Sequence, residues 1–268
     1  MSTRPIGIFD SGVGGLTVAK AINKIMPNEN LIYFGDIAHT PWGDKPSETI
    51  QYYATQITTL LLKHNCKAIV IACNTASSLA FKAVQKYAGV HIFVLNVIDP
   101  VVKYLEHNYS RQTIGLIGTK QTIRSKTYQS NSALLDEGLT IQPLETSLLA
   151  PLVERGFARK DLTRIILYEY LSNPKLQNIS ALVLGCTHYP FLTREIKNYY
   201  ANSDNAVDII DCTTLTADAL YKYLSTHQLR SSACIKKNIF YVSDDNMFFT
   251  KVVNDFFSTS IHLKYHLL

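Results

Sequence analysis

The segment IVIACNT at residues 69–75 decides the fold, because in it a continuous apolar run ends in a polar turn. Such a run, without polar alternation, is typical of a strand buried on both faces of a parallel sheet. The pattern returns as LVLGCTH at residues 182–188. The two stretches predict equivalent strands in two halves of the chain, each with a cysteine just beyond its strand.

A second, weaker pair of stretches supports two similar halves. IGIFDSG at residues 6–12 resembles IGLIGT at residues 114–119, and the two pairs keep the same order along the chain with nearly the same offset. We therefore predict an α/β fold made of two pseudo-symmetric α/β domains with mainly parallel sheets. Ligands of open α/β sheets bind beyond the carboxyl ends of the strands, so we expect the site there.

Apolar runs alternate with helical patterns along the chain, which favours parallel sheets with helices on both faces. The expected strands are 5–9, 30–34, 67–72, 91–97, 113–118, 181–185, 207–211 and 238–242. The expected helices are 14–25, 48–64, 77–88, 122–135, 161–172, 191–200, 214–226 and 246–257.

Composition excludes several classes of protein. The chain has 268 residues, 47% of them hydrophobic and 18% charged, so it is not disordered. Its five cysteines are odd in number and match no zinc-finger spacing, which argues against a disulfide scaffold and a metal site. The net charge of +5 comes without long basic runs, so we expect no dedicated nucleic-acid surface. The start lacks a signal-peptide pattern and no stretch of 18 apolar residues occurs, so we expect a cytoplasmic protein with no membrane span.

Cys73 and Cys186 are the strongest candidates for chemistry. Each stands at a turn with polar neighbours, and the amide groups of a following helix favour an anion such as a thiolate. The alternative is that both are buried cysteines acting as small hydrophobic residues. Cys66 and Cys234 are expected to be structural.

The loop DSGVGG at residues 10–15 also follows a strand and opens a helix. It fits a nucleotide-binding loop poorly, because Thr17 stands where the last glycine belongs. Asp10 is a candidate proton acceptor from a thiol, or alternatively a helix N-cap. His188 is placed to stabilise a thiolate, whereas Glu154 is uninformative by spacing alone.

Two cysteines at matched positions suggest one site with a thiol on each side. Removing a proton from one face of a carbon and returning one to the other face inverts its configuration, and tuned thiols can act as acid and base. This favours a two-base racemase. A cysteine hydrolase, which needs one nucleophile and an oxyanion hole, fits the duplicated cysteine less well.

The chain resembles the glutamate racemases of the cofactor-independent aspartate/glutamate racemase superfamily over essentially its whole length. The resemblance is carried by IFDSGVGGLT (8–17), YFGD (33–36), PWG (41–43), ACNTAS (72–77), IGT (117–119), PLVE (151–154) and LGCTHYP (184–190). It implies two domains facing across a cleft that holds the active site. The first would comprise residues 1–97 and 208–268, and the second residues 98–207.

The resemblance also implies the site residues, and no metal. Cys73 and Cys186 would be the acid/base pair, with Asp10 assisting Cys73, and Glu154 and His188 assisting Cys186. The substrate would be held by Ser11, Pro41, Trp42, Gly43, Asn74, Thr75, Thr119 and Thr187.

The implied activity is interconversion of L- and D-glutamate without a cofactor, supplying D-glutamate for peptidoglycan synthesis. The expected partner is the small-molecule substrate, and a homodimer is left open. A racemase for aspartate or another acidic amino acid, or a binding or regulatory relative without the chemistry, are the alternatives. The chain departs from the family at Trp42, where tyrosine is common, at residues 145–150, and at Cys212, where serine is usual.

Overall fold

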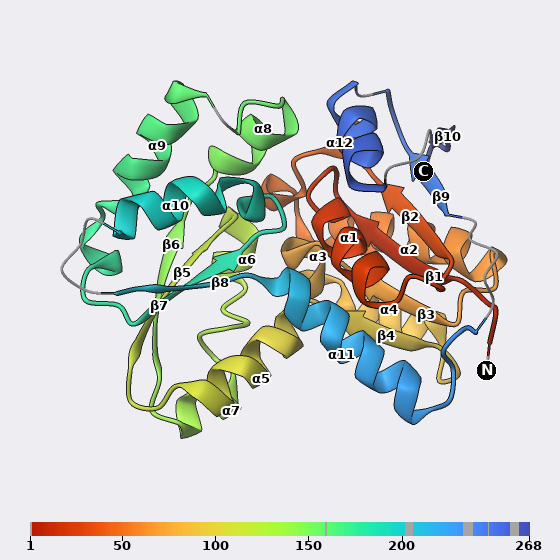
Figure 1. Cartoon of the computed structure of the whole chain (residues 1–268), viewed down its shortest axis with the longest axis horizontal. Helices are drawn as coiled ribbons and strands as arrows, with labels where there is room; N and C mark the ends of the chain where they lie inside the picture. Colours follow the sequence, from red (N-terminus) through yellow and green to blue (C-terminus); the bar gives the residue numbers. More distant parts are fainter. Residues whose placement is uncertain (1, 159, 202–205, 233–237, 246, 258–262) are drawn as a thin grey trace.

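Two parallel sheets form the framework of the protein. The computed structural model describes residues 2–158, 160–201, 206–232, 238–245, 247–257 and 263–268. The larger sheet contains β1 (Ile6–Asp10), β2 (Leu31–Gly35), β3 (Ala68–Ile71), β4 (Phe93–Asn96), β9 (Ile239–Val242) and β10 (Leu263–Tyr265). The smaller contains β5 (Thr113–Gly118), β6 (Thr140–Glu145), β7 (Ala181–Gly185) and β8 (Asp208–Ile210). The sheets lie side by side, the larger on the right in Figure 1.

The strand orders confirm two similar halves. Four strands of the larger sheet run in the order β2-β1-β3-β4, and the smaller sheet repeats this as β6-β5-β7-β8. All of these pairings are parallel. β9 and β10 extend the larger sheet beyond β2, so the end of the described chain returns to the first half. The fold is therefore the expected α/β arrangement of two mainly parallel sheets.

Helices cover the sheets. They are α1 (Leu16–Ile25), α2 (Ser47–Lys63), α3 (Asn74–Leu79), α4 (Phe81–Ala88), α5 (Ile98–Asn108), α6 (Lys120–Arg124), α7 (Ser132–Asp136), α8 (Leu149–Glu154), α9 (Asp161–Leu171), α10 (Thr193–Tyr200), α11 (Cys212–Thr226) and α12 (Met247–Phe257). α11 packs against α1 and α5, and α2 packs against α3 and α4. Among the described residues, no helix is long and apolar enough to span a membrane.

Burial on both faces explains why the strands of the larger sheet read as continuous apolar runs. In β3, Ala68 and Val70 join the hydrophobic cluster that contains α1, whereas Ile69 and Ile71 join the cluster that contains α2. Successive side chains of a strand point to opposite faces, so both sets must be apolar when helices cover both faces.

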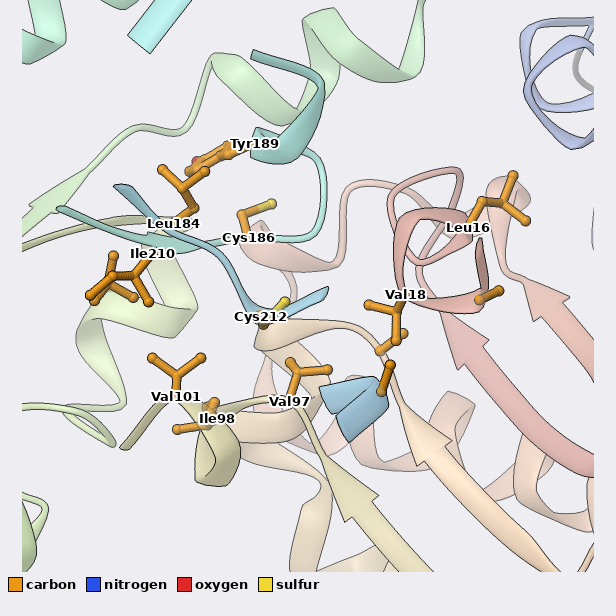
Figure 2. Close-up of a cluster of buried hydrophobic side chains, with 14 of the residues drawn as sticks. Leu16, Val18, Val97, Ile98, Val101, Leu184, Cys186, Tyr189, Ile210 and Cys212 are labelled. Carbon is orange, nitrogen blue, oxygen red and sulfur yellow. The ribbon is translucent and has the colours of Figure 1, made fainter. Parts of the chain in front are cut away.

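One hydrophobic cluster continues through both halves. Val18 of α1, Ile98 of α5 and Leu184 of β7 all belong to it, and Cys212 at the start of α11 lies among these side chains (Figure 2). The packing of apolar side chains therefore joins the half that carries Cys73 to the half that carries Cys186.

The sequence analysis missed three elements that contain a proline, namely α5, α8 and β6. Pro100 and Pro151 each stand third in their helices, α5 and α8, where a backbone N–H would have no partner within the helix. Pro143 lies in β6, at the edge of the smaller sheet, where a strand tolerates the missing donor. The predicted strand list also lacked β10.

Two predicted helices were wrong in extent. Residues 77–88 belong to two helices, α3 and α4, which meet at Ala80. Residues 122–135 divide into α6 and α7, because Lys126 has a φ of 56° and Asn131 caps a new helix with its side-chain oxygen. A lysine at positive φ cannot continue a right-handed helix.

We propose the division into two domains that the resemblance implies, with one change at the second boundary. Asp208 was expected to begin the return to the first domain, but β8 pairs with β7 in the smaller sheet, so the return follows β8. Of the two cysteines expected to be structural, Cys66 is fully buried, and burial raises the pKa of its thiol to about 12. Cys234 lies outside the described residues.

A buried ion pair between Lys67 and Glu29 lies in the first half, next to the amino end of β3. The Lys67 ammonium donates to Glu29 Oε2 at 2.6 Å and to the carbonyl oxygens of Leu229 and Ser2 at 2.7 and 2.9 Å. Glu29 Oε1 accepts the backbone N–H of Ser231 at 2.8 Å. One pair of charges therefore joins four segments that are distant in sequence.

Replacing Lys67 with alanine should lower the free energy of unfolding by about 3–5 kcal/mol, because the buried Glu29 carboxylate would lose its cationic partner. Chemical denaturation measures this. The matched control is Lys63→Ala at the exposed end of α2, which should change stability by no more than about 0.5 kcal/mol. A loss below about 1 kcal/mol in Lys67→Ala would contradict the assigned role of the pair.

Candidate active site

The candidate site lies beyond the carboxyl ends of the central strands of both sheets. Asp10 is the last residue of β1, and Cys73 is the second residue after β3. In the smaller sheet Thr119 follows β5 directly and Cys186 follows β7 directly. Equivalent strands in the two halves thus deliver the functional side chains.

A cavity of about 260 Å³ lies between the two halves. All of the predicted site residues except Asp10 line it: Ser11, Pro41, Trp42, Gly43, Cys73, Asn74, Thr75, Thr119, Glu154, Cys186, Thr187 and His188. Asp10 is fully buried behind this wall. Four lining residues were not predicted, namely Thr40, Ala150, Pro151 and Arg155.

Cys73 occupies the N-cap position of α3 and is almost completely buried. Its Sγ lies 3.7 Å from Ser11 Oγ. Burial raises the pKa of the Cys73 thiol to about 12, and the negative charge of Asp10 adds to this, while a hydrogen bond from the backbone of Ala76 opposes it. Cys73 is therefore a thiol at neutral pH in the free protein.

Asp10 is held by three groups around it. Its Oδ2 accepts the N–H of Gly12 at 3.0 Å and its Oδ1 accepts the Thr187 hydroxyl at 3.1 Å, a contact that crosses between the halves. Burial raises the pKa of Asp10, while the positive charge of His188 and hydrogen bonds from the backbone of Gly15 and Gly12 oppose that shift. The N-cap residue of α1 is Gly15, so Asp10 does not have the alternative role of N-cap.

Cys186, His188 and Glu154 form a chain of contacts. Cys186 Sγ lies 3.4 Å from His188 Nδ1, and His188 Nε2 contacts Glu154 Oε1 on the other side of the ring. Burial by itself lowers the pKa of His188, but the negative charges of Cys186, as a thiolate, and of Glu154 outweigh it, so this pKa lies well above its ordinary value. The imidazolium is thus the favoured form beside Cys186.

Glu154 also reaches across the cavity to the first half. Its Oε1 accepts the backbone N–H of Val13 at 2.8 Å. The sequence predicted neither this contact nor the burial of Glu154, which is 9% exposed although its spacing suggested an ordinary surface carboxylate. Position in the fold, not spacing, makes Glu154 part of the site.

Two glycines permit this close approach of the halves. A Cβ at Gly12 would lie 2.7 Å from Glu154 Cδ, and one at Gly14 would lie 2.5 Å from Thr187 Oγ1. Both distances are too short for any side chain. The glycine-rich loop therefore lets Glu154 reach the backbone N–H of Val13 and lets Thr187 reach the Asp10 carboxyl group, and it carries no nucleotide-binding pattern.

Hydroxyl groups from both halves meet on one wall. Thr75 Oγ1 of α3 lies 2.8 Å from Thr119 Oγ1, which in turn lies 3.0 Å from Thr122 Oγ1 of α6. Thr119 also caps α6 by accepting the N–H of Thr122. Thr122 was not predicted, because it lies behind the wall and orients a residue that lines it.

Asn74 is fixed at both ends of its amide. Its Oδ1 accepts the Tyr128 hydroxyl at 3.0 Å, and its Nδ2 lies 4.0 Å from Cys212 Sγ. Cys212 is buried at the start of α11, near Cys186 in Figure 2. The cysteine at this position thus supports a residue of the cavity wall from behind.

Trp42 differs from the family's usual tyrosine without placing a new donor in the cavity. Its indole N–H donates to Asp36 Oδ2 at 2.9 Å, and Asp36 Oδ1 lies 2.7 Å from His39 Nδ1. Asp36 therefore holds the segment 37–44, which supplies Pro41 and Gly43 to the cavity. In the segment 145–150, which also departs from the family, the Thr146 and Tyr189 hydroxyls lie 2.7 Å apart, and Ala150 lines the cavity.

Comparison with known proteins agrees with this geometry. The family model described as Asp/Glu/Hydantoin racemase matches residues 16–220. This chain belongs to that family. The glutamate racemase of Chlorobaculum parvum is 40% identical over 97% of this chain and 94% of its own length. The family and its relatives found by these comparisons are racemases, so the chain is an amino-acid racemase, which is an isomerase.

Solved structures share the whole fold. The glutamate racemase of Francisella tularensis, crystallised with D-glutamate, superposes with a TM-score of 0.87 at 36% identity over 99% of this chain and 98% of its own. A glutamate racemase isoform from Bacillus anthracis gives a TM-score of 0.90 at 30% identity over 100% and 99%. The two-domain racemase fold expected from the sequence is therefore confirmed.

Replacing Glu154 with glutamine should lower the pKa of His188, because the negative charge disappears while the burial that lowers this pKa remains. NMR titration of the imidazole resonances measures it, with the His188 signal assigned by its loss in His188→Gln. The pKa of His188 is higher in the folded protein than in the unfolded chain. Protonated His188 therefore contributes its whole stabilisation below the unfolded-state pKa, and this contribution is lost as the pH rises through the folded-state pKa.

The charge-matched control is Glu169→Gln, at an exposed position of α9. It should leave the His188 titration unchanged. An unaltered His188 pKa in Glu154→Gln would show that the contact between these two side chains does not form in solution.

Proposed function

We propose that this chain is a glutamate racemase, which interconverts L- and D-glutamate by proton transfer between two cysteines at the α-carbon. The observation that carries the proposal is the meeting of Cys73 and Cys186 in one cavity, each delivered by an equivalent strand end and each with its own polar partners. The named relatives act as support, since the Francisella tularensis enzyme binds D-glutamate in the same fold.

The chemistry balances without an oxidant or a cofactor. One cysteine, as a thiolate, takes the α-proton: the C–H bond breaks, an S–H bond forms, and the electron pair stays on the substrate beside its carboxylate. The other cysteine, as a thiol, gives its proton to the opposite face, so its S–H bond breaks and a new C–H bond forms. The product is the other enantiomer. The cysteine that began as a thiolate is now a thiol, and the other is now a thiolate.

The protein's own groups differ on the two sides. Cys73 starts as a thiol, with Asp10 and Ser11 nearby to receive and return its proton. Cys186 has His188 Nδ1 at 3.4 Å, so its polar partner is an imidazole ring instead of a carboxyl group and a hydroxyl. The burial that raises the pKa of Cys73 thus favours the acid form on that side of the cavity.

The cavity wall is suited to an amino acid with carboxylates. Amide groups at the start of α3 and the hydroxyls of Thr75 and Thr119 are donors for charge that builds up on a carboxylate during proton removal. We propose that Ser11, Asn74 and the segment 41–43 complete the binding of the substrate. A volume near 260 Å³ suits a small metabolite.

The cellular role follows from the proposed product. D-glutamate is a building block of peptidoglycan, so we propose that the chain supplies that pathway. A cytoplasmic location stays a prediction from the sequence, and assembly into a homodimer stays open.

Racemisation of L-glutamate in D₂O should yield D-glutamate that carries deuterium at the α-carbon, because the returning proton comes from a thiol that exchanges with solvent. Proton NMR and mass spectrometry of the product measure this. L-aspartate, one methylene shorter, should react with a kcat/KM about 10–200-fold lower. Product that keeps protium throughout would rule out two-base transfer, and a preference for aspartate would reassign the substrate.

Cys73→Ser and Cys186→Ser should each lower kcat by about 10²–10⁴-fold, since a serine hydroxyl is far too weak an acid to exchange the α-proton. The matched control is Cys66→Ser, a buried cysteine outside the cavity, which should keep the wild-type kcat. Full turnover by either site variant would remove that cysteine from the mechanism. A covalent acyl group trapped on one cysteine would instead indicate a hydrolase.

A further inference from the structure

Arg155 lines the cavity on the Cys186 side and was not among the predicted site residues. It follows α8 directly, and its side chain is exposed to solvent while it lines the cavity. Gly156 ends the helix at a φ of 75°, and a Cβ there would lie 3.1 Å from Phe248 of α12. The end of α8 is therefore packed against α12, beside which it lies at the top of Figure 1.

The charges of the lining residues give Arg155 its significance. Among the described residues that line the cavity, His188 and Arg155 are the two that carry positive charge. His188 is committed to Cys186 and Glu154. The Arg155 guanidinium makes no hydrogen bond or ion pair with another described side chain, so its five donors are free for a ligand.

The interior needs such a charge if its ligand is an anion. Glu154 places a buried carboxyl group in the cavity wall and Asp10 places a second one behind it, and a dicarboxylic amino acid brings two more carboxylates with a single ammonium. A cleft with low-dielectric walls focuses the field of its charges, so one exposed cation at the entrance acts strongly on an approaching anion. Arginine also matches a carboxylate with two parallel hydrogen bonds.

We propose that Arg155 draws dicarboxylic amino acids into the cavity and selects them over their neutral amides. The proposal rests on the proposed racemase function. Arg155 does not reach the α-carbon chemistry, which belongs to the buried cysteines, so it acts on capture of the substrate. Its effect must fall on KM and on the dependence on salt, and not on kcat.

Arg155→Gln should lower kcat/KM for glutamate by about tenfold at low ionic strength, with kcat within about twofold of wild type. Raising the salt to about 1 M shortens the Debye length to about 3 Å and should reduce the difference to less than about threefold. Arg155→Lys, which keeps the charge, should retain most of kcat/KM. The charge-matched control is Arg194→Gln on α10, an exposed arginine outside the cavity lining, which should behave as wild type at every salt concentration.

A binding measurement separates this proposal from the proposed reaction. Trp42 is the single tryptophan of the chain and lines the cavity, so its fluorescence reports occupancy without turnover. Glutarate should bind wild type more tightly than its monoamide, and Arg155→Gln should remove most of that preference while Arg194→Gln keeps it.

Each outcome has a distinct meaning. An Arg155-dependent preference for glutarate in a protein that does not racemise glutamate would support the role of Arg155 and overturn the proposed reaction. Active wild type with equal salt profiles for Arg155→Gln and Arg194→Gln would overturn the role of Arg155 and leave the reaction standing. A fall in kcat with unchanged KM would also overturn it, because capture acts on KM.

Discussion

The arrangement of the site depends on the two contacts of the Glu154 carboxylate. It binds the backbone N–H of Val13 in the first half and the His188 ring in the second, so a single charged group spans the two halves. Gly12 and Gly14 leave the space that this approach requires. Because His188 contacts Cys186, the position of one catalytic candidate is tied to a loop of the opposite half.

Two similar halves produce an asymmetric site. The strand order of one half repeats in the other, and each places a cysteine beyond an equivalent strand. The neighbours differ, because Asp10 is negative where Cys73 lies and His188 is positive where Cys186 lies. Burial strengthens the interactions of both side chains with their neighbours, since water no longer screens them. The same side chain therefore has different electrostatic surroundings on the two sides of one cavity.

Much of the site was predictable because its residues follow apolar strands directly in the chain. A polar turn after such a strand places its side chains at the carboxyl edge of a sheet, so residues as distant as Cys73 and Cys186 were predicted together, whereas Ser11 and Thr187 were implied by the family resemblance. Residues behind the wall were not predictable. Thr122 and Tyr128 act by orienting Thr119 and Asn74, and nothing in their local sequence marks that role.

The sequence by itself determined the two halves, their parallel sheets and the pair of cysteines, because periodicity and strand-end turns are local properties of the chain. Only the tertiary structure decided which charges surround each thiol. Glu154 was an ordinary carboxylate by its spacing and became a buried bridge, and Arg155 became the uncommitted cation among the described residues of the cavity lining. Burial and distance set electrostatic energies, and both exist only once the halves have packed together.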